Sequence, residues 1–126
     1  MVLVVPPPRP DANIDHFTPT HFEKLYPLVS AFCVVTYDFS SPQRPGANAP
    51  LYWINHAVEH ICPNNTEGYR ERRQKVQIGL NLYGNDYTPD GSGDTVVGSQ
   101  FLDLLKHFKG RLYHDEHDEE NYFEIK

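Results

Sequence analysis

Four polar side chains stand near the ends of two apolar segments, and their types suit an uncharged, hydroxyl-rich ligand. Tyr37 and Asp38 close a nearly continuous apolar run, and Asn81 and Tyr83 belong to a stretch that alternates apolar and polar residues. The tyrosine rings offer stacking faces, while the carboxylate and the amide add hydrogen bonds without strong charge. A sugar fits this set better than a phosphate does. Ordinary core packing of Tyr37 and Tyr83 is the alternative, and the residues alone leave both interpretations open.

Histidines give a second and weaker indication of chemistry. His56 and His60 stand at i and i+4 of an expected helix, a spacing that zinc sites use. The glutamate between them does not occupy its position in the His-Glu-x-x-His motif, and a third ligand is not evident. His114 and His117 lie in an acidic run, and such runs are usually solvated surface. We therefore predict no metal site and no cofactor.

Strands and helices are expected to alternate over the first two thirds of the chain. The expected elements are a strand at Val2–Val5, a helix from about 19 to 27 capped by Thr18, a buried strand at Ala31–Tyr37, a helix opened by Asn48 that reaches Ile61, and a strand at Val76–Tyr83. The strand–helix–strand spacing occurs twice, which predicts two right-handed crossovers in a parallel sheet.

The remainder of the chain has a different pattern, typical of an appended α+β element. A turn-rich loop over 89–94 precedes an amphipathic helix that runs from Phe101 to Phe108 and is closed by Gly110. After an acidic run over 115–120, the residues from Tyr122 onward resemble a strand. We expect that last strand to lack a partner.

Composition limits the class of protein. The chain has 126 residues, 39% of them hydrophobic, and a formal net charge of −6, which predict one globular domain. Phosphate binding requires a basic surface, so nucleic acid is not an expected partner. A membrane helix needs about 20 apolar residues, and no such segment occurs. No signal peptide is recognisable, so the chain as written would stay in the cytosol. Cys33 and Cys62 are expected to be free thiols.

Three segments of the sequence resemble glycoside hydrolase family 18, in the correct order and at the correct spacing. Val35–Asp38 resembles the Met-x-Tyr-Asp motif on the sixth barrel strand of that family, with valine in place of methionine. Asn48–Leu51 resembles the start of the following helix, and Ile78–Gly84 resembles the seventh strand. The resemblance extends over nearly the whole chain.

The resemblance implies a fold of the α/β class, a partial TIM (β/α)₈ barrel. Residues 1–84 would hold barrel strands five to seven, and residues 85–126 would begin an α+β insertion after strand seven. A complete barrel takes about 250 residues. We therefore expect the chain to be a fragment of a longer protein.

Hydrolysis in this family depends on one acid that the chain is expected to lack. The acetamido group of the sugar attacks the anomeric carbon, and a glutamic acid protonates the leaving oxygen. That glutamate ends an Asp-x-x-Asp-x-Asp-x-Glu motif on strand four. Here only Asp115 and Asp118 match its beginning, in a polar run without strand character. The resemblance therefore implies no catalytic residue in this chain.

Binding residues follow from the same resemblance. It assigns Tyr37 and Asp38 to the acetamido group of the sugar, and strand alternation extends the role to Asn81 and Tyr83. We therefore expect the chain to bind a chitooligosaccharide-type glycan without catalysis. Two alternatives stay open: a segment of an active glycosidase whose glutamate lies upstream, and a small α/β module for protein interaction.

Partners and location are implied for the parent protein. The resemblance points to secretion or a lysosome, and to a scavenger-type receptor as a partner besides the oligosaccharide. Secretion would give meaning to the sequon Asn64-Asn65-Thr66, so Asn64 is a candidate for glycosylation. Nucleic acid and membranes are not expected partners.

Overall fold

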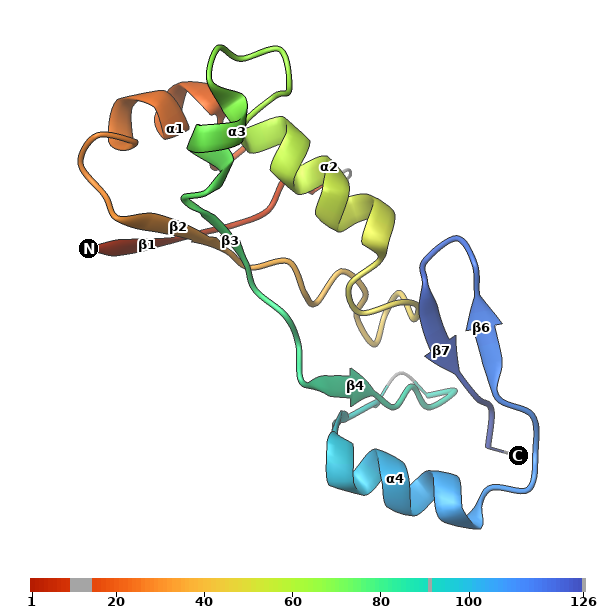
Figure 1. The fold of residues 1–126 in the computed structure, drawn as a ribbon. Coiled ribbons are helices and arrows are strands. Elements are labelled where there is room, and N and C mark those ends of the chain that lie inside the picture. The colour runs from red at the N-terminus through yellow and green to blue at the C-terminus, as the bar shows by residue number, and fades with distance from the viewer. Residues whose placement is uncertain (10–14, 91, 126) are drawn as a thin grey trace. The chain divides into compact units, whose positions relative to one another are not determined.

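The computed structural model describes residues 1–9, 15–90 and 92–125, and the chain divides into two compact units (Figure 1). Unit 1 comprises Met1–Thr36 and Tyr52–Leu80, and Unit 2 comprises Tyr37–Leu51 and Asn81–Lys126. Each unit is therefore built from segments that are distant in sequence. The predicted boundary between a barrel part and an insertion near residue 84 stays a prediction.

A three-stranded parallel sheet is the centre of Unit 1. Its strands are β1 (Val2–Val5), β2 (Ala31–Val34) and β3 (Val76–Ile78), in the order β1-β2-β3. Val5 lies opposite Val34, which lies opposite Ile78 in turn. The three prolines that follow β1 cannot donate ladder hydrogen bonds, so the strand ends where the sequence predicts. The parallel arrangement confirms the expected parallel sheet, while the right-handed sense of its crossovers stays a prediction.

In the part of Unit 1 that the structure describes, three helices accompany the sheet: α1 (Pro19–Leu25), α2 (Leu51–Ile61, of which Tyr52 onward belongs to this unit) and α3 (Tyr69–Arg73). The Thr18 side chain accepts a hydrogen bond from the backbone N–H of His21, which confirms the predicted cap. Phe22 of α1 and Ala57 of α2 pack against Phe32 in one buried core. Because Phe32, Val5 and Val34 share a face of the sheet, the core lies between that face and the helices.

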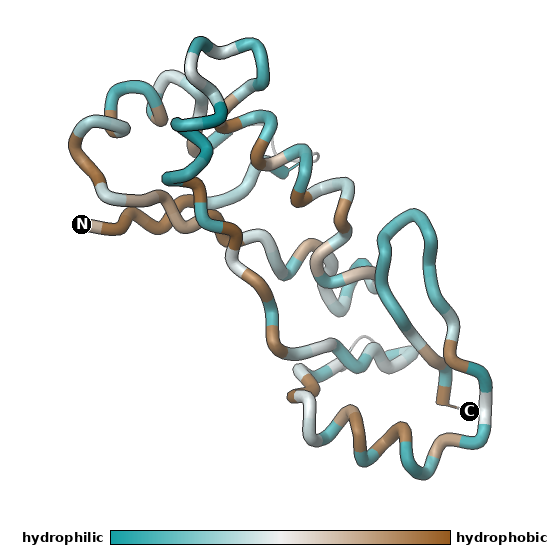
Figure 2. Tube along the Cα trace, viewed as in Figure 1, coloured by the Kyte–Doolittle hydropathy of each residue, from teal (hydrophilic) through white to brown (hydrophobic). Residues whose placement is uncertain are grey.

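The opposite face of the sheet is left uncovered among the described residues. Val2 and Val4 are 54% and 65% exposed, and they alternate with the inward-facing residues of β1. Figure 2 shows β1 in the hydrophobic colour, as its four apolar residues require. Cys33, on the same face, and Cys62 in the core are free thiols, as expected. Within the described ranges, no helix has the length and apolar character needed to cross a membrane.

The described residues of Unit 2 form two hairpin-like sheets and one helix. Strands β4 (Tyr83–Asn85) and β5 (Thr95–Val97) are antiparallel, and α4 (Gly98–His107) follows β5 directly. Strands β6 (Tyr113–Asp115) and β7 (Glu120–Tyr122) form the second antiparallel pair. The described part of α4 contains no buried side chain.

Three sequence expectations are wrong. The stretch Val76–Tyr83 is not one strand, because β3 ends at Ile78 and Tyr83 begins β4 in Unit 2. The strand expected from Tyr122 onward lies earlier, at Glu120–Tyr122, and it has a partner, since β7 pairs with β6 and the acidic run forms their facing ends and the connection between them. Asn48 does not open the second helix, which begins at Leu51 after a proline.

Candidate functional site

All four predicted binding residues lie in Unit 2, and the structure joins them through Tyr83. The phenol Oη of Tyr83 donates a hydrogen bond to Asp38 Oδ1 over 2.5 Å. The rings of Tyr37 and Tyr83 meet edge to face, with centroids 6.3 Å apart and an interplanar angle of 78°. Asn81 Nδ2 donates to the backbone carbonyl of Tyr83 over 2.7 Å. The predicted set is therefore a connected cluster, and Tyr37 and Tyr83 are half-buried rather than core residues.

Asp38 owes its position to an unusual backbone conformation. Its φ of 59° lies in the left-handed region, which aspartate and asparagine tolerate better than most residues. The backbone N–H of Asp38 donates to Asn48 Oδ1 over 2.7 Å, and this bond fixes the turn. Backbone conformations of this kind persist where surrounding contacts determine them, and they cluster at ligand sites.

Asn48 is the residue that sequence reasoning assigned to the wrong role. It is buried, with 4% of its surface exposed, and its side chain contacts both halves of the cluster. Its Oδ1 atom accepts from Asp38, and its Nδ2 atom donates to the carbonyl oxygen of Tyr83 over 3.4 Å. A helix cap and a bridge between loops use the same amide chemistry, so the local sequence could not separate them.

The chemistry of the Tyr83–Asp38 pair is that of a fixed donor and acceptor. Partial burial, followed by the hydrogen bond to the Asp38 carboxylate, raises the pKa of Tyr83 to about 12. The phenol therefore stays protonated at neutral pH. It offers Asp38 a permanent O–H donor and orients the carboxylate for contacts with hydroxyl or amide groups of a ligand.

Asp38 also borders a small polar hollow in Unit 2, with a volume of about 170 Å³. Its lining residues are Asp38, Ser40, Ser41, Pro42, Asn85, Asp86, Tyr87, Gly93, Asp94 and Thr95. Most of these side chains carry hydroxyl, amide or carboxylate groups, which match the hydrogen-bonding groups of a sugar. Pockets for whole drug-sized ligands occupy roughly 300–1,000 Å³. This hollow therefore has room for one small polar group, such as an acetamido substituent.

One glycine allows the walls of the hollow to approach each other. A Cβ atom at Gly93 would lie 1.9 Å from the backbone carbonyl oxygen of Asp86. The N–H of Asp86 donates to the carbonyl of Asp94 over 2.8 Å, next to this contact. The sequence predicted a turn-rich loop here but did not indicate that Asn85 and Tyr87 line the same hollow as Asp38.

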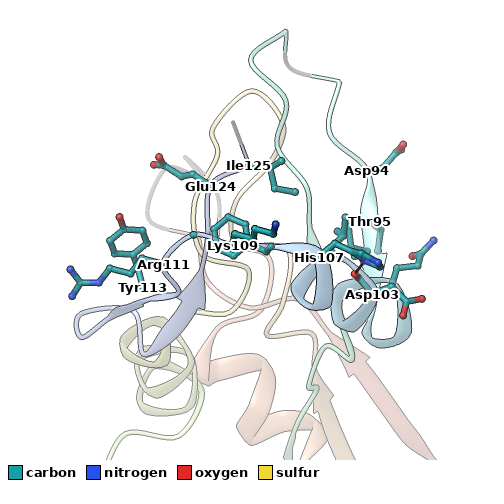
Figure 3. A pocket seen from close by; sticks show the side chains of 14 residues that line it. Asp94, Thr95, Asp103, His107, Lys109, Arg111, Tyr113, Glu124 and Ile125 are labelled. Carbon is teal, nitrogen blue, oxygen red and sulfur yellow. Dashed lines mark hydrogen bonds between the residues drawn. The ribbon is translucent and has the colours of Figure 1, made fainter.

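A second, larger hollow in Unit 2 contains none of the four predicted residues. It has a volume of about 1110 Å³ and lies between α4, β5 and the chain around β6 (Figure 3). Lys109 and Arg111 lie along it together with Asp103 and Glu124, so its charges are of both signs. His107 Nδ1 lies 2.8 Å from the backbone carbonyl oxygen of Asp103, so this ring nitrogen already has a hydrogen-bond partner within α4.

Two of the histidines singled out by their spacing, His60 and His114, contact carboxylate or amide groups. His60 Nε2 lies 2.5 Å from Asp15 Oδ2, and the His56 ring lies 6.2 Å from the His60 ring. His114 contacts Asn121 and, over 3.4 Å, the carboxylate of Glu119. Among the described residues, no three histidine, cysteine or acidic side chains gather as metal ligands would.

No known protein family matches the chain by its sequence profile. Solved structures do match. The class V chitinase from Pseudomonas fluorescens Pf-5 superposes with a TM-score of 0.71 at 20% identity, over 95% of this chain and 36% of that one. The chitinase from Chromobacterium violaceum ATCC 12472 gives 0.70 at 19% identity, over 93% and 36% of the two chains. The fold is chitinase-like.

A spore cortex-lytic enzyme, SleL from Bacillus megaterium QM B1551, superposes with a TM-score of 0.68 at 17% identity. That match covers 98% of this chain and 28% of the enzyme. The chain thus spans well under half the length of each of these proteins. The likeness establishes a mixed α/β, glycosidase-like fold, and at such identities it establishes the fold alone.

Proposed function

We propose that this chain binds an N-acetylated oligosaccharide of the chitooligosaccharide type, through Tyr37, Asp38, Asn81 and Tyr83, and does not itself hydrolyse it. The observation that carries the proposal is the Tyr83–Asp38 hydrogen bond beside the polar hollow. The Tyr83 phenol donates its one proton to Asp38 and so orients the carboxylate, whose remaining lone pairs can accept a hydrogen bond from the N–H of an acetamido group. The chitinase-like fold supports a carbohydrate ligand.

The proposal includes a position within a larger barrel. We assign β1, β2 and β3 to strands five to seven of a TIM barrel, and the chain after residue 84 to an insertion. The parallel order of the strands supports this assignment. We further propose that the chain belongs to glycoside hydrolase family 18 and resembles chitinase domain-containing protein 1, the stabilin-interacting chitinase-like protein.

Hydrolysis is the second candidate function, because solved proteins with this fold include chitinases. It requires a glutamic acid at the glycosidic oxygen. The nearest sequence match to that motif is structural here, since the Asp115 carboxylate accepts hydrogen bonds from the backbone N–H groups of His117 and Asp118. These bonds lower the pKa of Asp115, and the position that the motif gives to the glutamic acid is occupied here by Tyr122.

Isothermal titration calorimetry of the chain with tri-N-acetylchitotriose measures the affinity and so tests the binding proposal. Asp38→Asn keeps a residue that tolerates the left-handed backbone but removes the charge, and it should weaken binding about ten- to a hundredfold with little change in melting temperature. Tyr37→Phe, which removes one hydroxyl, should have a smaller effect. The matched control is Asp103→Asn, which removes the same charge beside the larger hollow and should not alter affinity.

A core substitution separates binding from folding. Val34→Ala truncates a fully buried side chain of Unit 1, so it should lower the melting temperature without a specific effect on affinity for the sugar. Sugar affinity that falls with Asp103→Asn and not with Asp38→Asn would contradict the proposal.

Secretion and a receptor partner extend the proposal to the parent protein. Asn64 of the sequon is exposed, and its backbone N–H donates to Glu59 Oε1 over 2.8 Å. We propose that Asn64 carries a glycan when the protein passes through the secretory pathway. An endoglycosidase should then shift the electrophoretic mobility of the secreted protein, and Asn64→Gln should abolish that shift.

A further inference from the structure

A carboxylate from the β6–β7 hairpin holds the loop that positions Asp38. Glu120 Oε2 accepts a hydrogen bond from the backbone N–H of Asn48 over 2.9 Å, and its Oε1 accepts from the N–H of Ala49 over 2.6 Å. The two oxygens of one side chain thus bind two consecutive amides, which lie about 70 positions earlier in the sequence. Charge-assisted bonds of this kind are stronger than neutral ones.

The same hairpin makes a second tether to this loop. The backbone N–H of Leu51 donates to the carbonyl oxygen of Asp118 over 3.1 Å. The hairpin connection is itself fixed, because the Asp115 carboxylate accepts from His117 and Asp118, and the N–H of Glu119 donates to the Asp115 carbonyl over 2.8 Å. Glu120 therefore projects from a hydrogen-bonded support rather than from a loose acidic run.

The contacts continue from Glu120 to the proposed binding pair. Glu120 fixes the backbone of Asn48, and the Asn48 side chain then accepts from the N–H of Asp38 and donates to the carbonyl of Tyr83. These bonds hold Asp38 at its positive φ, opposite the Tyr83 phenol. Loss of the Glu120 carboxylate would leave the backbone N–H of the buried Asn48 without its acceptor, and the loop would be free to move.

We infer that Glu120 is a positioning residue, which acts through Asn48 to hold Asp38 and Tyr83 in the geometry that binds the sugar. The inference rests on the proposed function for its effect on affinity, but the positioning itself is independent of any ligand. It assigns a role to the insertion-like hairpin, whose acidic run the sequence indicates to be solvated surface.

Amide hydrogen exchange, followed by NMR on the full chain, tests positioning without a ligand. In Glu120→Ala the Asp38 amide should exchange about three- to tenfold faster than in the unaltered chain, because its acceptor loses its support. Glu120→Gln keeps only one acceptor oxygen and should give a smaller increase. Glu116→Gln removes an exposed carboxylate of the same connection and should change nothing. Unchanged Asp38 exchange in both Glu120 variants would overturn the inference.

A double-mutant cycle with tri-N-acetylchitotriose tests the link to binding. Glu120→Gln should weaken binding about three- to tenfold in the unaltered chain, but less than about twofold in the Asp38→Asn background. Equal losses in both backgrounds would show that Glu120 acts independently of Asp38, and would overturn the inference. If the unaltered chain does not bind the sugar, the proposed function fails, while the exchange measurement still decides whether Glu120 positions Asp38.

Discussion

Unit 1 and Unit 2 differ in the kind of contact that stabilises each of them internally. Among the described residues, every buried hydrophobic side chain of the core lies in Unit 1, and Phe22, Phe32 and Ile61 are at most 1% exposed. Within the described part of Unit 2 the buried residues are Ser40, Asn48 and Pro50, and two of these are polar. The candidate site thus lies in the unit that depends on hydrogen bonds and turns, where a few polar contacts determine side-chain positions.

The largest effect on stability is expected in the core of Unit 1. The Phe32 ring is fully buried, and its centroid lies 4.8 Å from that of Phe22. Phe32→Ala should lower the free energy of unfolding by about 3–5 kcal/mol, because it removes apolar burial and leaves a cavity. Denaturant unfolding measures the change. Val4→Ala, at a 65% exposed position of the same sheet, is the control, and an equal loss there would show that the face of β1 is buried.

In Unit 2 the largest effect is expected at a glycine. Gly93→Ala places a Cβ atom against the Asp86 carbonyl, so the loop must move, at a cost of about 1–3 kcal/mol. The shift should appear in the NMR signals of Asn85 and Tyr87, which line the hollow. At Gly84 a Cβ atom meets nothing within 4 Å, so Gly84→Ala should be neutral or slightly stabilising. Similar effects of both substitutions would contradict the close approach.

The contribution of Tyr83 in the candidate site to stability should depend on pH in the alkaline range. The folded-state pKa of Tyr83, about 12, lies above its ordinary value of 10, so the folded chain retains a proton that the unfolded chain loses. The stability from this group is fully present below pH 10 and is lost as the pH rises toward 12. Tyr83→Phe should therefore reduce the fall in melting temperature between pH 9 and pH 11. An identical fall in both proteins would show that Tyr83 does not titrate as expected.

The smallest effect is expected on the helix of Unit 2. Leu102 in α4 is 57% exposed, so Leu102→Ala removes little buried surface and should change stability by less than about 0.5 kcal/mol. Thermal unfolding measures it. A loss of several kcal/mol would mean that the apolar residues of α4 are packed as closely as Ile61 in the core of Unit 1.

The parts of the fold that the sequence predicts are those with local signals. Prolines end β1, Thr18 caps α1, and an unbroken apolar run marks β2. The error at Val76–Tyr83 has a nonlocal cause. Alternation continues past Ile78, but β2 ends at Val34, so no neighbouring strand remains to pair with. Hydrophobic periodicity cannot report where a partner strand stops.

The candidate site shows the same limit. Residue types and resemblance select Tyr37, Asp38 and Tyr83, and the structure places these residues in contact, while their binding role stays a prediction. They could not indicate that Asn48 bridges the pair or that Glu120 supports Asn48, because these contacts join residues far apart in sequence. An acidic run has the same composition whether it is solvated or binds backbone amides.

The most direct test of the binding account is a residue-resolved NMR titration of the isotopically labelled chain with tri-N-acetylchitotriose. We expect saturable shifts that are largest at Asp38, Tyr83 and Tyr87, around the smaller hollow of Unit 2. Shifts centred instead on His107 and Arg111, in the larger hollow, or no shifts at millimolar sugar, would contradict it.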